Sequence, residues 1–161
     1  MRKQAVTVSL LLVALLAVGG CQGRSSGVSD ERNVVKLVRS AAAQVVSKGE
    51  AAFGDFRTRG GAWRHDDFYI FVLDLKGNML VHPQPEMEGR NLIYLEDLDR
   101  KPIIRALIKA AVASPSGEGW CDYRWSQPEK YFPLNKRTFV KSAVTPRGKK
   151  YVVGCGYYLK H

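Results

Sequence analysis

Between residues 34 and 57, apolar side chains recur every three or four positions, which is the spacing of one face of an α-helix. The stripe consists of Val34, Leu37, Val38, Ala41, Ala42, Val45, Val46, Ala51, Ala52, Phe53 and Phe56. Ser29 can cap the N-terminus of this helix, because Asp30 and Glu31 then lie at the positive end of its dipole. Gly49 interrupts the stripe, so we expect a bend there. The pattern predicts a long helix that lies across one face of a sheet.

A β-hairpin is predicted next, at residues 68–82. The run FYIFVL and the shorter run MLVH flank the turn sequence KGN, in which Gly77 can adopt a positive φ. The second strand ends at His82, because Pro83 has no N–H for the ladder. The polar, turn-rich segment 84–98 then predicts a long loop. We expect this loop to cover a pocket for a small ligand on one face of the sheet.

One helix and three strands complete the pattern. Pro102 suits the first turn of a helix, whose apolar side comprises Ile103, Ile104, Leu107, Ile108, Ala111 and Val112. Runs with strand-like composition follow at residues 119–125, 137–144 and 150–159. Their short connections require antiparallel neighbours. The order of elements predicts an α+β domain of PAS-like shape, an antiparallel sheet with the long N-terminal helix on one face and a loop plus helix covering the other.

The first twenty residues look like an export signal rather than part of this fold. Their apolar run is shorter than the ~20 residues that a membrane-spanning helix needs. The run ends in VGGC, which resembles the bacterial lipobox. We therefore expect a lipoprotein with a signal peptide at residues 1–20, a diacylated Cys21, a tether over residues 21–29 and one domain at 30–161. An ordinary signal peptide with an incidental cysteine, or an uncleaved anchor, is the alternative.

The formal net charge of the 161-residue chain is +10, of which Arg2 and Lys3 contribute two within the expected signal. Export excludes nucleic acid as the partner of this basic chain. A basic surface suits anionic lipid headgroups or cell-envelope polymers instead. Gln22 is not the aspartate that resembles an inner-membrane retention signal. We therefore expect a position in the outer membrane, facing the periplasm, if the cell has two membranes.

A series of motifs resembles a known family. The motifs are YIFVLDLKGNMLVHP, EGRNL, Asp97, Asp99, Pro102, GEGW, Tyr123, Trp125, Pro128, Lys136 with TFV, and VVGCGYY. In this order and spacing they resemble the single Cache domain, an extracytoplasmic sensor module of bacterial chemoreceptors and histidine kinases. The resemblance implies a five-stranded antiparallel sheet of PAS-like order and a pocket for a small organic ligand, often a short carboxylate. Since the given chain ends at His161 without a signalling domain, we expect any signal to pass to a separate receptor or kinase in the envelope.

A pocket for a small anion needs apolar walls, a few donors and usually one fixed cation. Lys136 matches the family's lysine at the start of the fourth strand and is the expected cation; a surface lysine is the alternative. Tyr123 and Trp125 point to one face of their strand, where they either line the pocket or pack against the long helix. His82 either donates to the ligand or caps its own strand. Tyr94, in the covering loop, is the fifth candidate.

Cys121 and Cys155 could form a disulfide in an oxidising envelope. In a PAS-like strand order they would be two strand spacings apart, roughly 9 to 10 Å, whereas a disulfide needs Cα atoms within about 7 Å. Two buried free thiols, which could face the same pocket, are therefore favoured. The pair has neither a CxxC motif nor a histidine at ligand spacing, so we expect no zinc, and no CxxCH motif predicts haem.

Three functions compete. The first is a lipid-anchored module that binds or senses a small molecule, most simply a short organic acid. The second is an envelope structural or interaction module whose pocket has collapsed. The third is an enzyme that uses Cys121 or Cys155 with a histidine, but His65, His82 and His161 lie in no recognisable catalytic motif. We therefore expect no enzymatic activity, no metal and no cofactor.

Overall fold

The computed structural model describes residues 26–65, 67–127 and 132–159. The expected signal peptide and Cys21 lie outside these ranges. Helix α1, Ser26–Lys48, begins before Ser29, so this serine lies inside the helix rather than at its N-cap. The difference is small in energetic terms, because a helix that has nucleated extends over residues of modest propensity at little cost.

Gly49 ends α1 where the sequence predicts a bend. Its φ of +62° lies in the left-handed region, which glycine adopts without the strain of a Cβ atom. The chain then turns through the 3₁₀ helix η1, Gly49–Ala52, into the short helix α2, Phe53–Arg57. The apolar stripe of the sequence therefore belongs to two helices at an angle, and Phe53 and Phe56 of α2 are both buried.

A five-stranded antiparallel sheet has the order β4-β3-β7-β6-β5. Its strands are β3 (Phe71–Asp74), β4 (Met79–Val81), β5 (Glu118–Ser126), β6 (Pro133–Val144) and β7 (Lys150–Tyr158). The run that predicted one strand is split at Ile70, whose N–H donates to the carbonyl of Trp63. The residues before it form β2, Phe68–Tyr69, which pairs with β1, Arg64–His65, in a separate two-stranded sheet.

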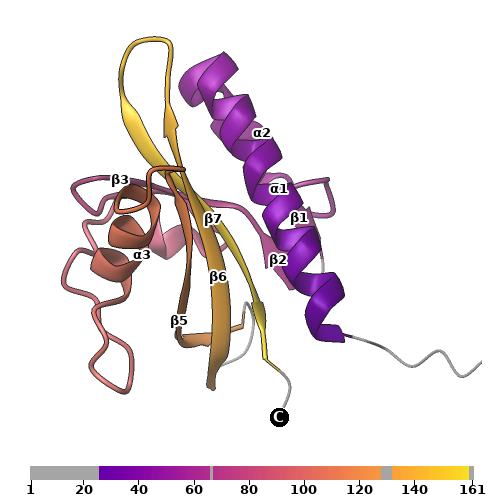
Figure 1. Cartoon of the computed structure of the whole chain (residues 1–161), viewed down its shortest axis with the longest axis vertical. Helices are drawn as coiled ribbons and strands as arrows, with labels where there is room; N and C mark the ends of the chain where they lie inside the picture. The colour runs from indigo at the N-terminus through magenta and orange to yellow at the C-terminus, as the bar shows by residue number, and fades with distance from the viewer. Residues whose placement is uncertain (1–25, 66, 128–131, 160–161) are drawn as a thin grey trace, which may run out of the picture.

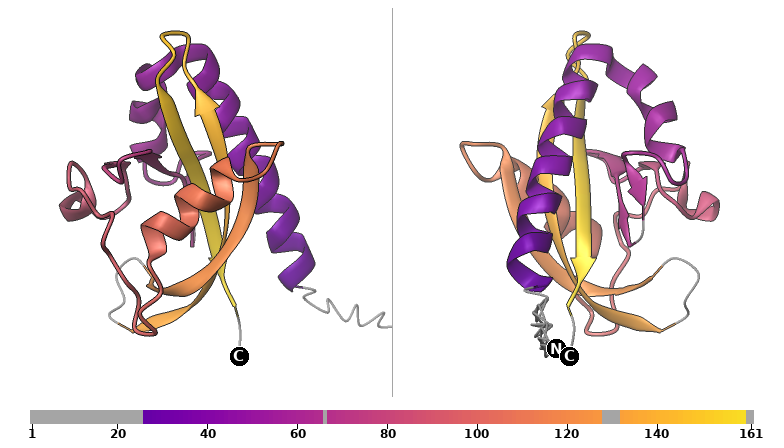
Figure 2. Two further views of the ribbon diagram at one scale, coloured as in Figure 1. Left: turned by 60° about the vertical axis from the view of Figure 1, so that its left-hand side comes forward. Right: turned by 90° about the vertical axis from the view of Figure 1, so that its right-hand side faces the viewer.

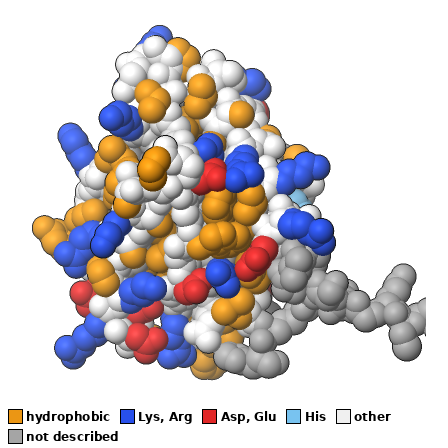
Figure 3. Space-filling view, viewed as in Figure 1, with side chains coloured by type: hydrophobic (Ala, Val, Ile, Leu, Met, Phe, Trp, Pro, Cys, Tyr) orange, Lys and Arg blue, Asp and Glu red, His pale blue; other side chains and the backbone are white. Residues whose placement is uncertain are grey.

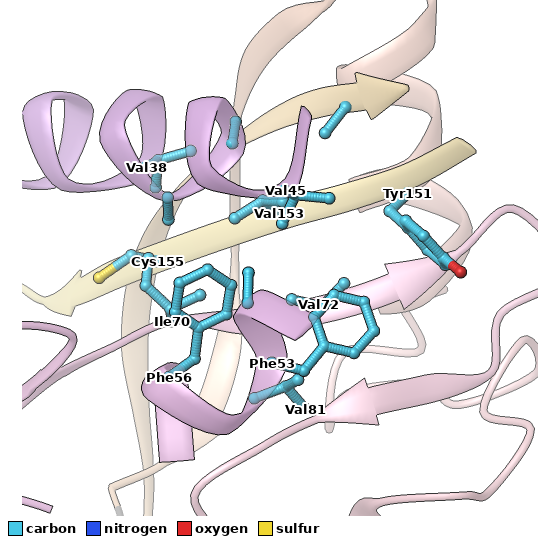
Figure 4. Packing of buried hydrophobic residues seen from close by; sticks show 14 of the residues in the cluster. Val38, Val45, Phe53, Phe56, Ile70, Val72, Val81, Tyr151, Val153 and Cys155 are labelled. Atoms are coloured by element: carbon cyan, nitrogen blue, oxygen red, sulfur yellow. The ribbon is translucent and has the colours of Figure 1, made fainter. Parts of the chain in front are cut away.

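The two faces of the sheet are covered by different helices (Figure 1; Figure 2). Helix α1 lies along one face, where its side chains form a core with those of α2, β3 and β7 (Figure 4). Helix α3, Ile103–Val112, packs on the opposite face. The segment before it contains the 3₁₀ helix η2, Pro85–Met87, and contributes Leu92 to the second core. The predicted α+β architecture is confirmed.

Strand register decides which side chains share a face, because residues directly opposite one another in a sheet point the same way. Trp120, Phe139 and Cys155 are opposite one another on β5, β6 and β7, and they belong to the core beneath α1. The row that contains Tyr123, Lys136 and Tyr158 is three positions further along the strands, an odd number, and so faces α3. The functional argument concerns this second face.

The face of the molecule in Figure 3 carries both hydrophobic and charged side chains. Figure 3 shows Lys and Arg side chains spread over the face in view, with Asp and Glu mainly in its lower half. Among the residues that the structure describes, no helix is long and apolar enough to cross a membrane.

Candidate functional site

A small cavity lies between the sheet and α3. Its walls are Tyr69, Phe71, Met79, His82, Ile103, Ile104, Leu107, Tyr123 and Trp125. Its free volume is about 10 Å³, close to the minimum that one water molecule occupies. The cover is α3, through Ile103, Ile104 and Leu107, rather than the loop 84–98 that the sequence predicted. The amphipathic helix has the wider apolar face, and its burial removes more apolar area from water than the polar loop could.

Lys136 extends from β6 on the face of the sheet that α3 covers and contacts Tyr69 of the cavity wall. Its side chain is only 1% exposed, although lysine is almost never fully buried without a partner. Its Nζ donates to the hydroxyl of Tyr69 at 2.6 Å and lies 3.9 Å from the centroid of the same ring. The ring centroid of Tyr158 is 4.9 Å away on another side. Two tyrosine rings therefore stabilise the ammonium through their π faces.

No carboxylate lies within ion-pair distance of Lys136 among the described residues. Asp67 acts on it only through space. Removal of an ammonium from water without an opposite charge disfavours its charged form. Burial accordingly lowers the pKa of Lys136 to about 7. The site thus contains one cation that titrates near neutrality and that has unused hydrogen-bonding capacity, since an ammonium has three donors.

His82 supplies a neutral donor beside this cation. Its Nδ1 accepts a hydrogen bond from the backbone N–H of Gln84 at 3.2 Å, so the proton of the neutral ring is on Nε2. Burial, and then the positive charge of Lys136, lowers the pKa of His82 to about 3. The ring packs edge-on against Tyr69, with a centroid distance of 5.4 Å, and against Trp125, at 6.0 Å. His82 therefore both caps its strand and forms part of the cavity wall as a neutral ring protonated on Nε2.

Tyr123 and Trp125 line the cavity rather than pack against α1. The hydroxyl of Thr138 donates to that of Tyr123 at 3.0 Å, which leaves the phenol proton of Tyr123 free to donate into the site. Burial raises the pKa of Tyr123 well above its usual value, so the group stays protonated. Three of the five predicted site residues, His82, Tyr123 and Trp125, thus line one cavity, and the fourth, Lys136, contacts Tyr69 of the same cavity wall.

Tyr94 lies elsewhere, which corrects the expectation that it closes over the ligand. It is 82% exposed, and the guanidinium of Arg105 lies 6.0 Å from its ring centroid. Its neighbour Leu92 points inward instead and is 8% exposed. The loop therefore buries its aliphatic side chain and leaves the tyrosine, whose hydroxyl has no partner in the interior, in water.

Tyr69, Tyr158 and Thr138 are site residues that sequence reasoning missed. The sequence GCGYY of the last strand contains a signal for Tyr158. Gly154, Gly156 and Tyr158 are two positions apart and so lie on the same face of the strand, where the two glycines leave space for neighbouring side chains. The hydroxyl of Tyr158 donates to the carbonyl of Ser126 at 2.9 Å, which holds its ring beside Lys136.

The two cysteines face opposite sides of the sheet, so the suggestion that both face one pocket is wrong. Cys155 lies in the core beneath α1 (Figure 4), and Cys121 lies in the core beneath α3. Both are buried free thiols. Burial raises the pKa of Cys155 to about 11 and also raises that of Cys121. Over the described residues, no three His, Cys, Asp or Glu side chains come together as a metal site.

A larger surface hollow, about 690 Å³, lies between η1 and the turn after β3. Its acids already have protein partners. Glu50 accepts hydrogen bonds from Lys149 and Tyr151, and Asp74 caps the turn through the backbone N–H groups of Lys76 and Asn78. The polar groups of the hollow are therefore already hydrogen-bonded within the protein, whereas the ammonium of Lys136 beside the small cavity has donors left for a ligand.

Comparison with known proteins assigns the fold to a family. The sequence model of the Cache domain matches residues 58–161. The chain belongs to the Cache domain family. A relative with 37% identity over 94 residues is the sensor histidine kinase MctS of Rhizobium johnstonii, and one with 28% identity over 96 residues is the methyl-accepting chemotaxis protein McpP of Pseudomonas putida. These matches cover 58% and 59% of this chain but only 19% and 16% of the relatives.

Solved structures share this architecture. The periplasmic sensor domain of a chemotaxis protein is 29% identical with a TM-score of 0.61, over 83% of this chain and 92% of that one. A Cache chemosensory domain described for carboxylic acid recognition is 24% identical with a TM-score of 0.65, over 82% and 95%. A methyl-accepting chemotaxis protein of Vibrio parahaemolyticus, 19% identical with a TM-score of 0.64 over 81% and 88%, shows the same fold. The chain is therefore a Cache sensor domain, a class of extracytoplasmic module that typically works as a receptor and not as an enzyme.

Proposed function

We propose that this Cache domain binds a short monocarboxylate in the cavity between its sheet and α3. The observation that carries the proposal is the burial of Lys136 without a carboxylate partner in the described chain. A ligand carboxylate would supply that missing charge. The Nε2–H of His82 and the hydroxyl of Tyr123 are neutral donors at the same cavity, and they suit the second carboxylate oxygen.

The count of charges favours one carboxylate over two. Among the described residues Lys136 is the single buried cation at the site, and His82 stays neutral because its pKa is about 3. A second carboxylate would be buried among Ile103, Ile104 and Leu107, where no donor compensates for the loss of its hydration. The apolar cover instead suits a short alkyl chain.

Binding requires the cavity to widen. A free volume of about 10 Å³ holds no more than about one water, which is less than any carboxylic acid needs. The side chain of Trp125 is only partly buried and forms one end of the wall, so its rotation or a shift of α3 is the simplest way to admit a ligand. In this proposal the narrow cavity is the closed conformation of the site.

The cellular context belongs to the same proposal. Acylation at Cys21 would hold the domain at an envelope membrane, and a separate receptor or kinase would take up the signal. The lipobox-like VGGC supports the anchor. The relatives, a sensor histidine kinase and a chemotaxis protein, support a role in signalling, and the structural neighbour described for carboxylic acid recognition supports the ligand class.

The small volume of the cavity supports one alternative, an interaction module with a closed interior. The enzyme alternative is weaker, because nucleophilic catalysis needs a thiolate. Burial raises the pKa of both Cys121 and Cys155, so each remains a thiol near neutral pH.

Calorimetric and thermal titration of the purified protein with formate, acetate, propionate, butyrate and succinate would test the proposal. A ligand at 100 times its Kd stabilises the native state by about 2.7 kcal/mol, which raises Tm by several degrees. We expect stabilisation by one or more monocarboxylates, none by succinate, and none in Lys136→Met. Lys109→Met, at an exposed position of α3, is the matched control and should respond like the wild type. No response to any acid would favour the interaction module.

A further inference from the structure

The charge of Lys136 depends on what occupies the cavity. In the unliganded protein its ammonium has one hydrogen bond, to the hydroxyl of Tyr69, and no carboxylate in contact within the described chain. A buried amine without a counterion releases its proton far more easily than one in water. A carboxylate that contacts Nζ would reverse this effect, because an opposite charge at hydrogen-bonding distance favours the ammonium.

We propose that the site binds its carboxylate together with one proton, which Lys136 takes up, so that the domain responds to acid and to pH jointly. This inference rests on the proposed function and specifies how that site is regulated. In chemical terms, the carboxylate anion and a solvent proton bind to the neutral amine, and the product is an ammonium–carboxylate pair. No bond other than N–H forms, and the charge of the site does not change overall.

In the described part of the chain, burial moves the pKa of the tyrosines and the thiol around Lys136 away from neutrality. On β7, Cys155 lies on the other face of the sheet and acts on Lys136 only through space, and burial raises the pKa of its thiol to about 11. Tyr158, on the same face as Lys136, has a pKa that burial raises beyond its usual value. From β2, Tyr69 has a pKa well above normal. From β5, Tyr123 is likewise held protonated by burial.

Two further groups act on Lys136 from loops. His82, after β4, has a pKa of about 3 and is neutral over the relevant range. Asp67, after β1, acts on Lys136 as a negative charge through space, and its Oδ2 accepts a hydrogen bond from the side-chain amide of Gln127 at 3.0 Å. Helix α3 adds Arg105 and Lys109, but both are exposed to solvent. Proton uptake between pH 6 and 8.5 would therefore report on Lys136.

The linkage has a definite sign and size. Below pH 7 the unliganded lysine is already charged, so binding takes up little proton and affinity is independent of pH. Above pH 7 each unit of pH costs a factor of ten in apparent affinity, because the amine must first be protonated. The apparent Kd should rise about 30-fold between pH 6 and pH 8.5. In that upper range the occupancy follows the product of carboxylate and proton concentrations, which is proportional to the undissociated acid.

Isothermal titration calorimetry of the purified protein with acetate and propionate would test the inference. Titrations in HEPES and in Tris, whose ionisation enthalpies differ, give the number of protons taken up. We expect about one proton per ligand at pH 8.5 and almost none at pH 6, together with the 30-fold change in Kd. Binding with no uptake at pH 8.5 and a constant Kd would overturn the inference and leave the proposed function standing. No binding at any pH would overturn both.

Tyr69→Phe is the informative variant. It keeps the aromatic ring but removes the oxygen that accepts the hydrogen bond from Nζ, so the pKa of the unliganded lysine should fall further. The pH at which affinity begins to decline should move below 7, with uptake already evident at pH 6.5. An unchanged midpoint would contradict the role given to Lys136. Lys109→Met should keep the wild-type profile, and NMR titration of the Lys136 Cε signal in the unliganded protein gives the midpoint directly.

Discussion

Gly156 and Lys136 fit together closely on the face of the sheet beneath α3. A Cβ atom on Gly156 would lie 2.8 Å from Cε of Lys136 and 2.3 Å from Oγ1 of Thr138. Real Cβ atoms do not approach other atoms so closely, so the lysine can cross β7 only where this strand has no side chain. The glycine therefore positions the cation that we place at the centre of the site.

Gly156→Ala should displace Lys136 and weaken carboxylate binding at least tenfold. It should also lower the free energy of unfolding by about 1 to 3 kcal/mol, as overpacking of a closed core does. Denaturant unfolding and calorimetry measure the two effects. Gly54→Ala in α2 is the matched control, because a Cβ atom there meets nothing within 4 Å, and it should leave binding unchanged. Wild-type affinity in Gly156→Ala would mean that the path of Lys136 across β7 is unimportant.

Lys136→Met should abolish binding and yet stabilise the unliganded protein. Methionine has a similar volume and no charge to bury, and at pH 6 we expect a gain on the order of 1 to 4 kcal/mol. The pH dependence should change too. Since the folded-state pKa is about 7 and the unfolded value is near the ordinary 10.5, the unfolded wild type binds more protons between these pH values. Wild-type stability therefore gains a contribution as pH rises from 7 to 10.5, and Lys136→Met should lack it.

The outcome for Lys136→Met separates a functional from a structural lysine. If the variant is less stable at pH 6 than the wild type, Lys136 contributes more to folding through its contacts with Tyr69 and Tyr158 than its burial costs. Chemical denaturation of both proteins at pH 6 and pH 9 measures the difference in the free energy of unfolding and its change with pH.

The fold was largely predictable from the sequence, because its elements are strongly patterned. The helical stripe before Arg57 and the three final strands have clear periods, and Gly49 marks the end of α1. The division of the strand at Ile70 was not predictable, since the run FYIFVL has no turn residue within it. That break depends on the pairing of Ile70 with Trp63, a tertiary contact that no local pattern contains.

The candidate site was predictable in part, and its limits have a similar cause. Alternation along one strand places Tyr123 and Trp125 on the same face, and the family resemblance singled out Lys136. Tyr69 could not be found in this way, because its role depends on how far the lysine reaches across β7. The prediction for Tyr94 was wrong because a loop has no regular repeat along the sequence that shows which side chains point inward.

The hydrogen bond from Thr138 to Tyr123 should contribute to stability and to the shape of the site. Thr138→Val keeps the volume of the side chain but removes the donor, which leaves the buried phenol oxygen without its partner. We expect a loss of about 1 to 3 kcal/mol. Tyr123→Phe should cost less in the Thr138→Val background than in the wild type. A double-mutant cycle measures this coupling, and strictly additive effects would show that the bond contributes nothing.

The cysteines should behave as two unreactive thiols in the native domain. Cys121 and Cys155 are buried on opposite faces of the sheet, and burial disfavours the thiolate that alkylating reagents require. Iodoacetamide at pH 8 should therefore modify neither residue in the folded protein and both after denaturation in urea without reductant, as mass spectrometry of the tryptic peptides would show. A variant with one exposed cysteine, Ser116→Cys, should be alkylated rapidly under the native conditions and serves as the positive control. Protection of both thiols in the denatured, unreduced monomer would reveal a disulfide and would require the sheet to be rebuilt, because side chains on opposite faces cannot meet.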